Sequence, residues 1–216
     1  MAEVLERFPL FPLGIVCLPS EVVPLHIFEE RYKTMIGECL EEERPFGIIW
    51  LSDDGLREVG CTAEITQVLE RMDDGRLNIL VQGQNAFRLL RRVDDLPYPA
   101  GDVELLPDEA DEPAEAVGEA AREGYATLLE RATDTRPEQQ DLGALSAYEM
   151  AATVDFGLEA KQTLLELRSE GARLRALAEL FEAAVKRLDY VEHVSEAART
   201  NGHMRRGGLE SGPGGA

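Results

Sequence analysis

The hydrophobic pattern of this sequence changes its period near the middle, and this change constrains the fold more than any other feature. Up to about residue 106, short apolar runs separated by Asp-Gly turns and prolines indicate β-strands. From about residue 114, apolar side chains recur every three or four residues, which is the spacing of amphipathic helices. The intervening run PDEADEPAE is too acidic and too rich in proline to be buried, so it indicates a solvated linker. The sequence therefore predicts an α+β protein.

This pattern divides the chain into four parts. We expect a β-rich subdomain over residues 1–107, an acidic linker over 108–115, a helical subdomain over 116–198 and a disordered Gly-rich tail over 199–216.

The β-rich part is predicted to hold five or six short strands and one helix. Asp73-Asp74-Gly75 has the composition of a hairpin turn, and one helix is expected from Phe28 to Leu40, across an open end of the sheet. Short strands joined by turns favour a small antiparallel barrel or sandwich over a parallel sheet. The predicted strands cover residues 8–18, 46–51, 61–72, 77–81, 87–93 and 102–106.

The helical part is predicted to hold four helices, over 114–132, over 143–154, from Glu159, and a longest one at the end. In the last helix, an apolar stripe from Leu174 to Val191 follows intervals of three and four residues. Such a stripe is typical of core packing, and a surface for a partner helix is the alternative.

The charge excludes several classes of partner. Among 216 residues, 42 are acidic and 22 are basic, for a formal net charge of −20. A surface this negative repels nucleic-acid backbones and anionic membranes. RNA binding stays an alternative, and it requires one exposed face that gathers four arginines, Arg76, Arg88, Arg91 and Arg92.

Cysteine usage and the N-terminus indicate the compartment. Cys17, Cys39 and Cys61 form no CxxC pair, so neither a zinc knuckle nor a redox motif is indicated, and reduced thiols are expected. The start of the chain lacks a basic segment, its apolar stretch is broken by prolines, and no run approaches the length of a membrane helix. We expect a cytoplasmic protein.

Catalytic signatures are missing from the sequence. None of the three lysines follows a glycine as in a phosphate-binding loop, and the three histidines form no metal-binding motif. No serine lies in a G-x-S-x-G elbow, and paired carboxylates such as Asp53-Asp54 have the composition of turns. We therefore predict no catalytic residue, no metal and no cofactor, with an unrecognised ATP-independent hydrolase as the remaining enzymatic alternative.

Several ordered motifs resemble the N-terminal domain of the Lon ATP-dependent protease. The run Pro9–Leu13, which reads PLFPL, precedes a Pro-Leu-x-Ile-Phe-Glu-x-Arg-Tyr motif at Pro24–Tyr32. The similarity continues through Val59–Ile65 and Gly83, and reaches a Lys-Gln-x-Leu-Leu-Glu segment within Leu158–Glu166. It covers about residues 7–192.

The resemblance implies a PUA-like pseudo-barrel followed by a helical bundle. It also implies a non-catalytic module that binds unfolded or hydrophobic polypeptide segments, because this domain helps Lon to capture its substrates and to assemble. The ATPase and Ser-Lys protease modules of full-length Lon have no counterpart in this sequence. The expected partners are such polypeptides and a protease or chaperone, and the oligomeric state stays open. A small-molecule pocket of the cereblon type is a weaker alternative.

Candidate binding residues lie where the Phe-Glu-x-Arg-Tyr helix meets the barrel: Pro24, His26, Phe28, Tyr32 and Trp50. Each has a structural alternative, because Phe28 and Tyr32 share a helical face typical of the core, and Trp50 extends an apolar strand. His26 is expected to cap the helix or join the core. Residues expected to fix the motif structurally are Glu29, Arg31, Gly47 and Gly83.

Overall fold

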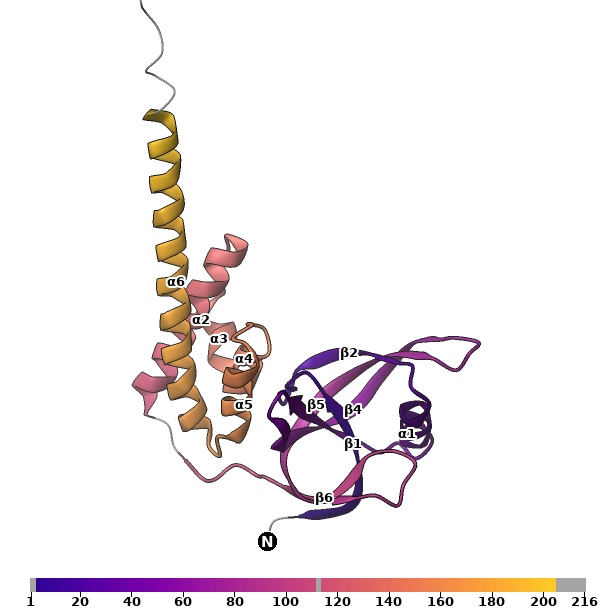
Figure 1. Cartoon of the computed structure of the whole chain (residues 1–216). Helices are drawn as coiled ribbons and strands as arrows, with labels where there is room; N and C mark the ends of the chain where they lie inside the picture. Colours follow the sequence, from indigo (N-terminus) through magenta and orange to yellow (C-terminus); the bar gives the residue numbers. More distant parts are fainter. Residues whose placement is uncertain (1–2, 112–113, 205–216) are drawn as a thin grey trace, which may run out of the picture.

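The computed structural model describes residues 3–111 and 114–204, which form a barrel-like sheet and a group of helices beside it (Figure 1). The described strands are β1 (Val4–Leu13), β2 (Val22–Ile27), β3 (Phe46–Ser52), β4 (Gly55–Arg71), β5 (Leu77–Val93) and β6 (Ala100–Leu105). The described helices are α1 (Glu30–Glu41), α2 (Glu115–Thr133), α3 (Gln139–Ala144), α4 (Ala147–Ala151), α5 (Leu158–Glu166) and α6 (Glu170–Met204).

The strands form one sheet in the order β2-β5-β4-β3-β1-β6, and a further pairing of β5 with β6 closes five of them into a barrel. Strand β5 makes closure possible, because its first half pairs with β2 and its second half pairs with β6. Strands β1 and β3 run parallel, with Leu10 opposite Gly47. The other pairings are antiparallel, as the sequence predicts. The parallel pair is the exception, since helix α1 returns the chain to the same end of the sheet before β3 begins.

A small cluster of buried side chains fills the barrel. Strands β3 and β5 are not neighbours, yet the ring of Phe87 reaches across to β3. A Cβ atom at Gly47 or Gly60 would lie 2.8 or 2.5 Å from that ring, so only glycine fits at these two positions. The members of the cluster are Phe8, Leu10, Ile49, Phe87 and Val103.

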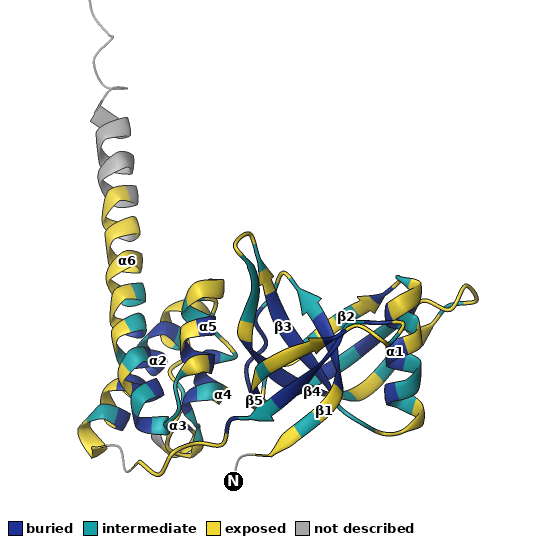
Figure 2. Cartoon of the chain, turned by 60° about the horizontal axis from the view of Figure 1, so that its bottom comes forward, coloured by how far each residue is buried: buried dark blue, intermediate teal, exposed yellow. Residues whose placement is uncertain are grey.

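A larger core lies on the outer face of the barrel and continues into the helical half (Figure 2). Helix α1 contributes the buried face that its spacing predicts, with Tyr32, Met35, Ile36 and Cys39. This face fixes the start of α1 against β1, where the ring centroids of Phe11 and Tyr32 lie 4.1 Å apart.

In the helical half, α2 and α6 lie side by side (Figure 1), and Tyr125 of α2 packs on Phe181 of α6 with centroids 5.6 Å apart. The single helix expected over 143–154 is two helices, α3 and α4, because Ser146 starts a new helix with a capping box to Glu149. Helix α6 runs to Met204, so residues 199–204 are helical, contrary to the prediction of disorder. The rest of that predicted tail, residues 205–216, lies outside the described residues.

The apolar stripe of α6 is buried from Leu174 through Phe181 and becomes exposed at Leu188 and Val191. Its first half is therefore core, and its second half is exposed at Leu188 and Val191. No helix in the described part of the chain is both long and apolar enough to cross a lipid bilayer.

Charged side chains tie the acidic run to the start of α6. The guanidinium of Arg173 is almost fully buried, and it donates hydrogen bonds to Asp108, Glu170 and the carbonyl of Leu167. Arg168 donates to the carbonyl of Pro107. The described residues 108–111 thus carry charge that neutralises a buried arginine, a role beyond that of a solvated spacer.

Helix α5 joins the helical half to the barrel. Lys161 Nζ lies 2.5 Å from Glu21 Oε1, and both side chains are largely buried. The buried Gln162 amide donates to the carbonyl of Val59, and Arg57 pairs with Glu159 at 2.8 Å. The Lys-Gln segment of the sequence is therefore the joint between the two halves.

Candidate functional site

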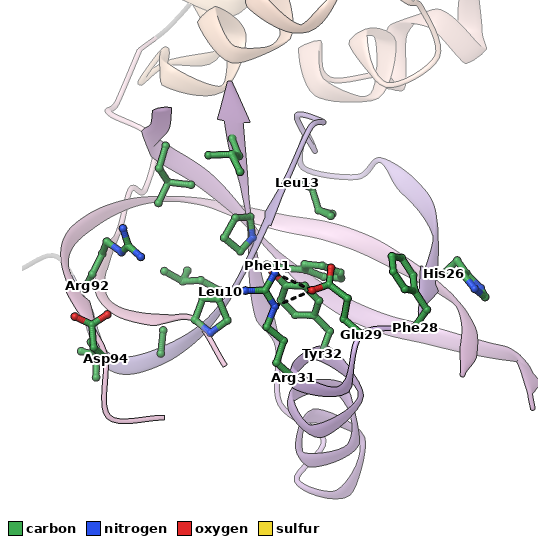
Figure 3. A pocket seen from close by; sticks show the side chains of 16 residues that line it. Leu10, Phe11, Leu13, His26, Phe28, Glu29, Arg31, Tyr32, Arg92 and Asp94 are labelled. Atoms are coloured by element: carbon green, nitrogen blue, oxygen red, sulfur yellow. Dashed lines mark hydrogen bonds and ion pairs between the residues drawn. The ribbon is translucent and has the colours of Figure 1, made fainter. Parts of the chain in front are cut away.

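A pocket of about 500 Å³ opens beside the start of α1, in the size range of small-ligand sites. It is built from four pieces of the barrel half: strand β1, the β2–α1 junction, the β3–β4 hairpin and the β5–β6 connection. Its lining is Leu10, Phe11, Pro12, Leu13, His26, Phe28, Glu29, Arg31, Tyr32, Leu51, Leu56, Arg92, Val93, Asp94, Pro99 and Ala100 (Figure 3).

The pocket has a buried apolar floor and an exposed apolar rim. On the floor, Leu10 and Phe11 are buried and Tyr32 is only 5% exposed. On the rim, Phe28 is 58% exposed and Leu51 is 52% exposed. Large apolar side chains left in water on two sides of an apolar hollow are typical of a surface that binds another apolar group.

Phe28 is exposed because it precedes the helix. Glu29 is the N-cap residue and α1 begins at Glu30, so the helical spacing that suggests a core position for Phe28 does not apply to it. The ring of His26 stacks on that of Phe28, with centroids 5.8 Å apart and an interplanar angle of 20°. His26 is exposed on β2, so it neither caps the helix nor joins the core.

A hydrogen-bond chain fixes the His26 ring. The amide nitrogen of Asn78 donates to Glu70 at 2.8 Å, which turns the amide oxygen of Asn78 toward His26 Nδ1 at 2.6 Å. Because that oxygen only accepts, Nδ1 carries the proton in this bond. The ring is therefore held in one orientation beside Phe28.

The motif residues Glu29, Arg31 and Tyr32 form a clamp at the mouth of the pocket. Nε and Nη2 of Arg31 both approach Oε2 of Glu29, at 2.9 and 2.8 Å. The paired guanidinium lies 4.6 Å from the centroid of the Tyr32 ring, within cation–π distance. Burial raises the pKa of Tyr32, so its hydroxyl stays neutral at physiological pH. The clamp holds the tyrosine ring as part of the floor.

Two arginines and two acids balance the charge of the lining. Arg31 is paired with Glu29, as the dashed lines of Figure 3 mark. The side chain of Arg92 makes no ion pair or hydrogen bond with any described residue, and neither does that of Asp94, which lines the same side. The pocket is thus neutral in sum, in a chain of net charge −20, and it contains one guanidinium with free donors.

Prolines occupy two strand edges, Pro12 at the pocket and Pro24 at the separate hollow on the β2 side. Leu10 N–H bonds to the carbonyl of Pro99, so by alternation the nitrogen of Pro12 faces the same side, next to the pocket. Pro24 lies within the ladder of β2 and β5, a position that requires its nitrogen to face the open edge. Proline has no N–H to donate, so neither edge offers a complete ladder to an added strand.

The structure brings only some of the sequence-predicted residues together. His26, Phe28 and Tyr32 line the pocket with Glu29 and Arg31. Pro24 lines a separate hollow on the β2 side, whereas Trp50 is buried under the guanidinium of Arg57, 4.8 Å away, and does not line the pocket. Leu51, Leu56 and Arg92 were not among the predicted site residues; the apolar run that ends at Leu51, just before a turn, is the one signal that could have pointed to it.

Gly47 and Gly83 serve close packing. Gly47 faces the Phe87 ring inside the barrel, and a Cβ atom on Gly83 would lie 2.1 Å from the carbonyl oxygen of Leu18. Neither glycine lines the pocket. Their part in the site is to allow β3 and β5 to hold their places in the barrel.

The arginines required for RNA binding do not gather on one face. Arg76 lies at the tip of the β4–β5 hairpin and pairs with Asp74 at 2.7 Å. Arg88 is twelve residues further along the chain, a path of about 40 Å along an extended strand. Arg91 pairs with Asp102 at 2.7 Å. The structure therefore gives this alternative no continuous basic surface.

The cysteines form no reactive or metal-binding group within the described residues. Cys17, Cys39 and Cys61 are all buried and unpaired. Burial raises the pKa of Cys39 to about 11 and that of Cys61 well above its ordinary value, so both are protonated thiols of low reactivity. No group of three or more potential ligands is close enough to hold a metal ion in the described part of the chain.

Comparison with known proteins identifies relatives over most of the chain. Lon protease 1 of Hydrogenovibrio crunogenus is 24% identical over 213 residues, which is 89% of this chain and 25% of that protein. Lon protease 2 of Thermus thermophilus is 26% identical over 90% of this chain and 26% of its own length. The chain thus spans about a quarter of the length of the curated relatives it matches.

Solved structures share the fold. A Lon N-terminal domain protein from Xanthomonas campestris is 25% identical, with a TM-score of 0.63 over 80% of this chain and 97% of its own. The N-terminal domain of a Mycobacterium avium complex Lon protease matches with a TM-score of 0.61 over 83% of this chain and 98% of its own, and at 20% identity it supports the fold alone.

The family is one of substrate-binding domains, which fits a binding role better than a catalytic one. Its sequence profile, that of the ATP-dependent protease La (LON) substrate-binding domain, matches residues 7–183, which run from within β1 to the buried part of α6. This chain belongs to the LON substrate-binding domain family.

Proposed function

We propose that this chain binds unfolded or hydrophobic polypeptide segments without catalysing a reaction on them, and that the pocket beside α1 is the binding site. The observation that carries the proposal is the exposure of Phe28 and Leu51 on the rim of an apolar hollow. Membership of a substrate-binding family supports a polypeptide as the ligand.

The geometry suits capture of side chains. The floor is preformed, because Tyr32 is clamped and packed on Phe11, so little entropy is lost when an apolar side chain enters. The proline-blunted edges disfavour extension of the sheet by the ligand backbone. Recognition therefore rests on apolar side chains, a chemistry that unfolded chains of many sequences share.

The rest of the chain supports this role. The negative surface that surrounds the small apolar patch would keep the protein and a bound apolar client in solution. Three buried, unpaired thiols suit a reducing compartment such as the cytoplasm. Within the proposal, residues 1–107 carry the binding site, the helical subdomain supports it, and a protease or chaperone receives the client.

Fluorescence anisotropy with labelled, reduced and carboxymethylated lactalbumin, a permanently unfolded polypeptide, tests the proposal. Leu51→Ser should weaken binding about fivefold, because burial of half a leucine side chain contributes about 1 kcal/mol. Leu90→Ser is the matched control, since Leu90 is 50% exposed and lies outside the pocket. Absence of binding by the unaltered chain at micromolar concentration, or equal losses in the two variants, would overturn the proposal.

A further inference from the structure

Arg92 differs from most other arginines of the barrel half. Those that pair with carboxylates are Arg7 with Asp95, Arg31 with Glu29, Arg44 with Glu38, Arg57 with Glu159, Arg76 with Asp74 and Arg91 with Asp102. Arg92 has no such partner among the described residues, although acidic residues outnumber basic ones almost two to one in the chain. Arg92 lines the apolar pocket, and its side chain donates no hydrogen bond to any described residue.

No carboxylate of the described residues forms an ion pair with Arg92, although Glu6, Asp94, Asp95 and Asp102 line a neighbouring hollow with it. Of these acids, Asp95 pairs with Arg7 and Asp102 pairs with Arg91. Glu29 also lines the pocket, but its carboxylate is already paired with Arg31. Asp94 lies on the same side of the lining, as Figure 3 shows, but it forms no ion pair with Arg92 within 4.0 Å. A guanidinium is suited to bind a carboxylate through two parallel hydrogen bonds. The pocket thus combines an apolar floor with an unfilled site for a carboxylate.

We propose that the pocket binds the carboxyl-terminal end of a polypeptide whose last residues are apolar, with Arg92 holding the terminal carboxylate. The apolar side chain of the ligand lies on the floor formed by Leu10, Phe11 and Tyr32, between the exposed rings and methyl groups of the rim. This inference rests on the proposed function, and it names the class of polypeptide that the same site prefers.

The proline-blunted edges favour a chain end over an internal segment. A segment that crosses the pocket would place peptide N–H and C=O groups against an apolar floor without ladder partners, at a cost in free energy for each buried group. Pro12 has no N–H that could donate a hydrogen bond to a carbonyl group of such a segment. A chain end inserts one or two side chains, and its last polar group meets Arg92.

Fluorescence anisotropy with one decapeptide in three forms tests this inference. The peptide carries fluorescein at its N-terminus and ends in Leu-Leu-Phe, either as the free acid or as the carboxamide. The third form is a carboxamide with one internal aspartate. For the unaltered chain, the free acid should bind about tenfold more tightly than either carboxamide. Arg92→Gln should reduce this preference to less than twofold.

Two further variants test whether the preference depends on Arg92 itself or on overall charge. Arg88→Gln removes an equal charge from the same strand, outside the pocket, and should keep the tenfold preference. Asp94→Asn removes the acid that repels a bound carboxylate, and should tighten binding of the free acid about threefold while leaving the carboxamide unchanged. Circular dichroism should show the same folded state for all three variants, because the three side chains are exposed.

The outcomes separate the two proposals. Equal binding of acid and carboxamide overturns the role of Arg92 and leaves polypeptide binding standing. Equal binding of the acid and the internal-aspartate form overturns the preference for a chain end. Loss of the preference in Arg88→Gln as much as in Arg92→Gln assigns it to overall charge, and also overturns the inference. If neither the decapeptides nor unfolded lactalbumin binds, the proposed function fails as well.

Discussion

Replacement of Arg173 by methionine should destabilise the helical half more than any other single loss of charge in the described chain. Arg173 is 2% exposed, and its guanidinium lies 4.2 Å from the centroid of the Tyr148 ring. It donates to Asp108 Oδ1 at 2.8 Å, to Glu170 at 3.1 Å and to the Leu167 carbonyl at 3.1 Å. Burial alone would lower the pKa of Arg173, but hydrogen bonding to Asp108 and the neighbouring charges raise it, so the side chain stays charged.

The expected loss follows from these contacts. Breaking a buried ion pair by removing one partner costs about 3–5 kcal/mol. Here the side chains of Asp108 and Glu170 are 49% and 32% exposed, so water replaces part of what they lose. The Leu167 carbonyl loses a hydrogen bond worth about 1 kcal/mol. Arg173→Met should therefore lower the free energy of unfolding by about 3 kcal/mol, since methionine keeps much of the packing volume.

Urea unfolding followed by far-ultraviolet circular dichroism measures this loss. Arg175→Met is the matched control, because Arg175 is exposed on the same helix and its one ion pair, to Asp111, spans 3.9 Å. The control should change stability by less than about 0.5 kcal/mol. If Arg173→Met costs no more than Arg175→Met, the acidic run does not anchor the helical half and the reasoning fails.

Three further sets of substitutions test close packing, the contact between the two halves and a helix cap. Gly83→Ala should cost about 3 kcal/mol in urea unfolding, because its Cβ would lie 2.1 Å from a backbone carbonyl oxygen that cannot move freely. A double-mutant cycle of Lys161→Met and Glu21→Gln should give a coupling energy of about 2 kcal/mol, since the pair joins the two halves and is largely buried. Hydrogen bonds from the α4 cap lower the pKa of Glu149, so its contribution is present above the ordinary pKa of glutamate and is lost as the pH falls through the lowered value. Glu149→Gln should accordingly cost about 0.5 kcal/mol at pH 7 and almost nothing at pH 3.

Each of these has its own control. Gly14→Ala should be nearly neutral, because no atom lies within 4 Å of its Cβ position, and an equal cost at both glycines would contradict the packing argument. A coupling energy below about 0.5 kcal/mol would show that the Lys161–Glu21 pair contributes no more than an exposed surface ion pair, against the prediction. A cost of Glu149→Gln that stays constant from pH 7 to pH 3 would show that the charge of the carboxylate does not matter.

The sequence predicts the elements that depend on neighbours in the chain. Helix α1 buries Tyr32, Met35, Ile36 and Cys39 as the 3.6-residue period requires. The Asp-Gly turn at residues 73–75 joins β4 to β5 as expected. The capping box that starts at Ser146 is also readable in the sequence, and it explains why one expected helix is two.

Features that join distant parts of the chain could not be predicted in this way. No local pattern indicates that β1 and β3 run parallel, or that Arg173 meets Asp108, 65 residues away. Strand β2 alternates exposed and less exposed residues, but Pro24 in its middle hides that pattern. The parts of the fold set by tertiary contacts therefore appear only in the structure.

The candidate site shows the same division. The Phe-Glu-x-Arg-Tyr motif indicates the N-terminal end of α1, and Glu29 and Arg31, which the sequence analysis expects to fix the motif, form an ion pair there. The exposure of Phe28 depends on its position just before the helix, which periodicity cannot locate to a single residue. Leu51 and Arg92 come from other strands, and only the closure of the barrel brings them to the pocket.

Photo-crosslinking from the pocket rim tests whether an unfolded polypeptide binds at the pocket beside α1. Benzoylphenylalanine would replace Leu51 in one variant and the equally exposed Leu90 in another, each irradiated with unfolded, carboxymethylated lactalbumin. If the pocket binds unfolded chains, position 51 should give a crosslinked product that an excess of unlabelled apolar peptide competes away, and position 90 should give little product. Equal yields from the two positions, or a higher yield from position 90, would contradict binding at the pocket.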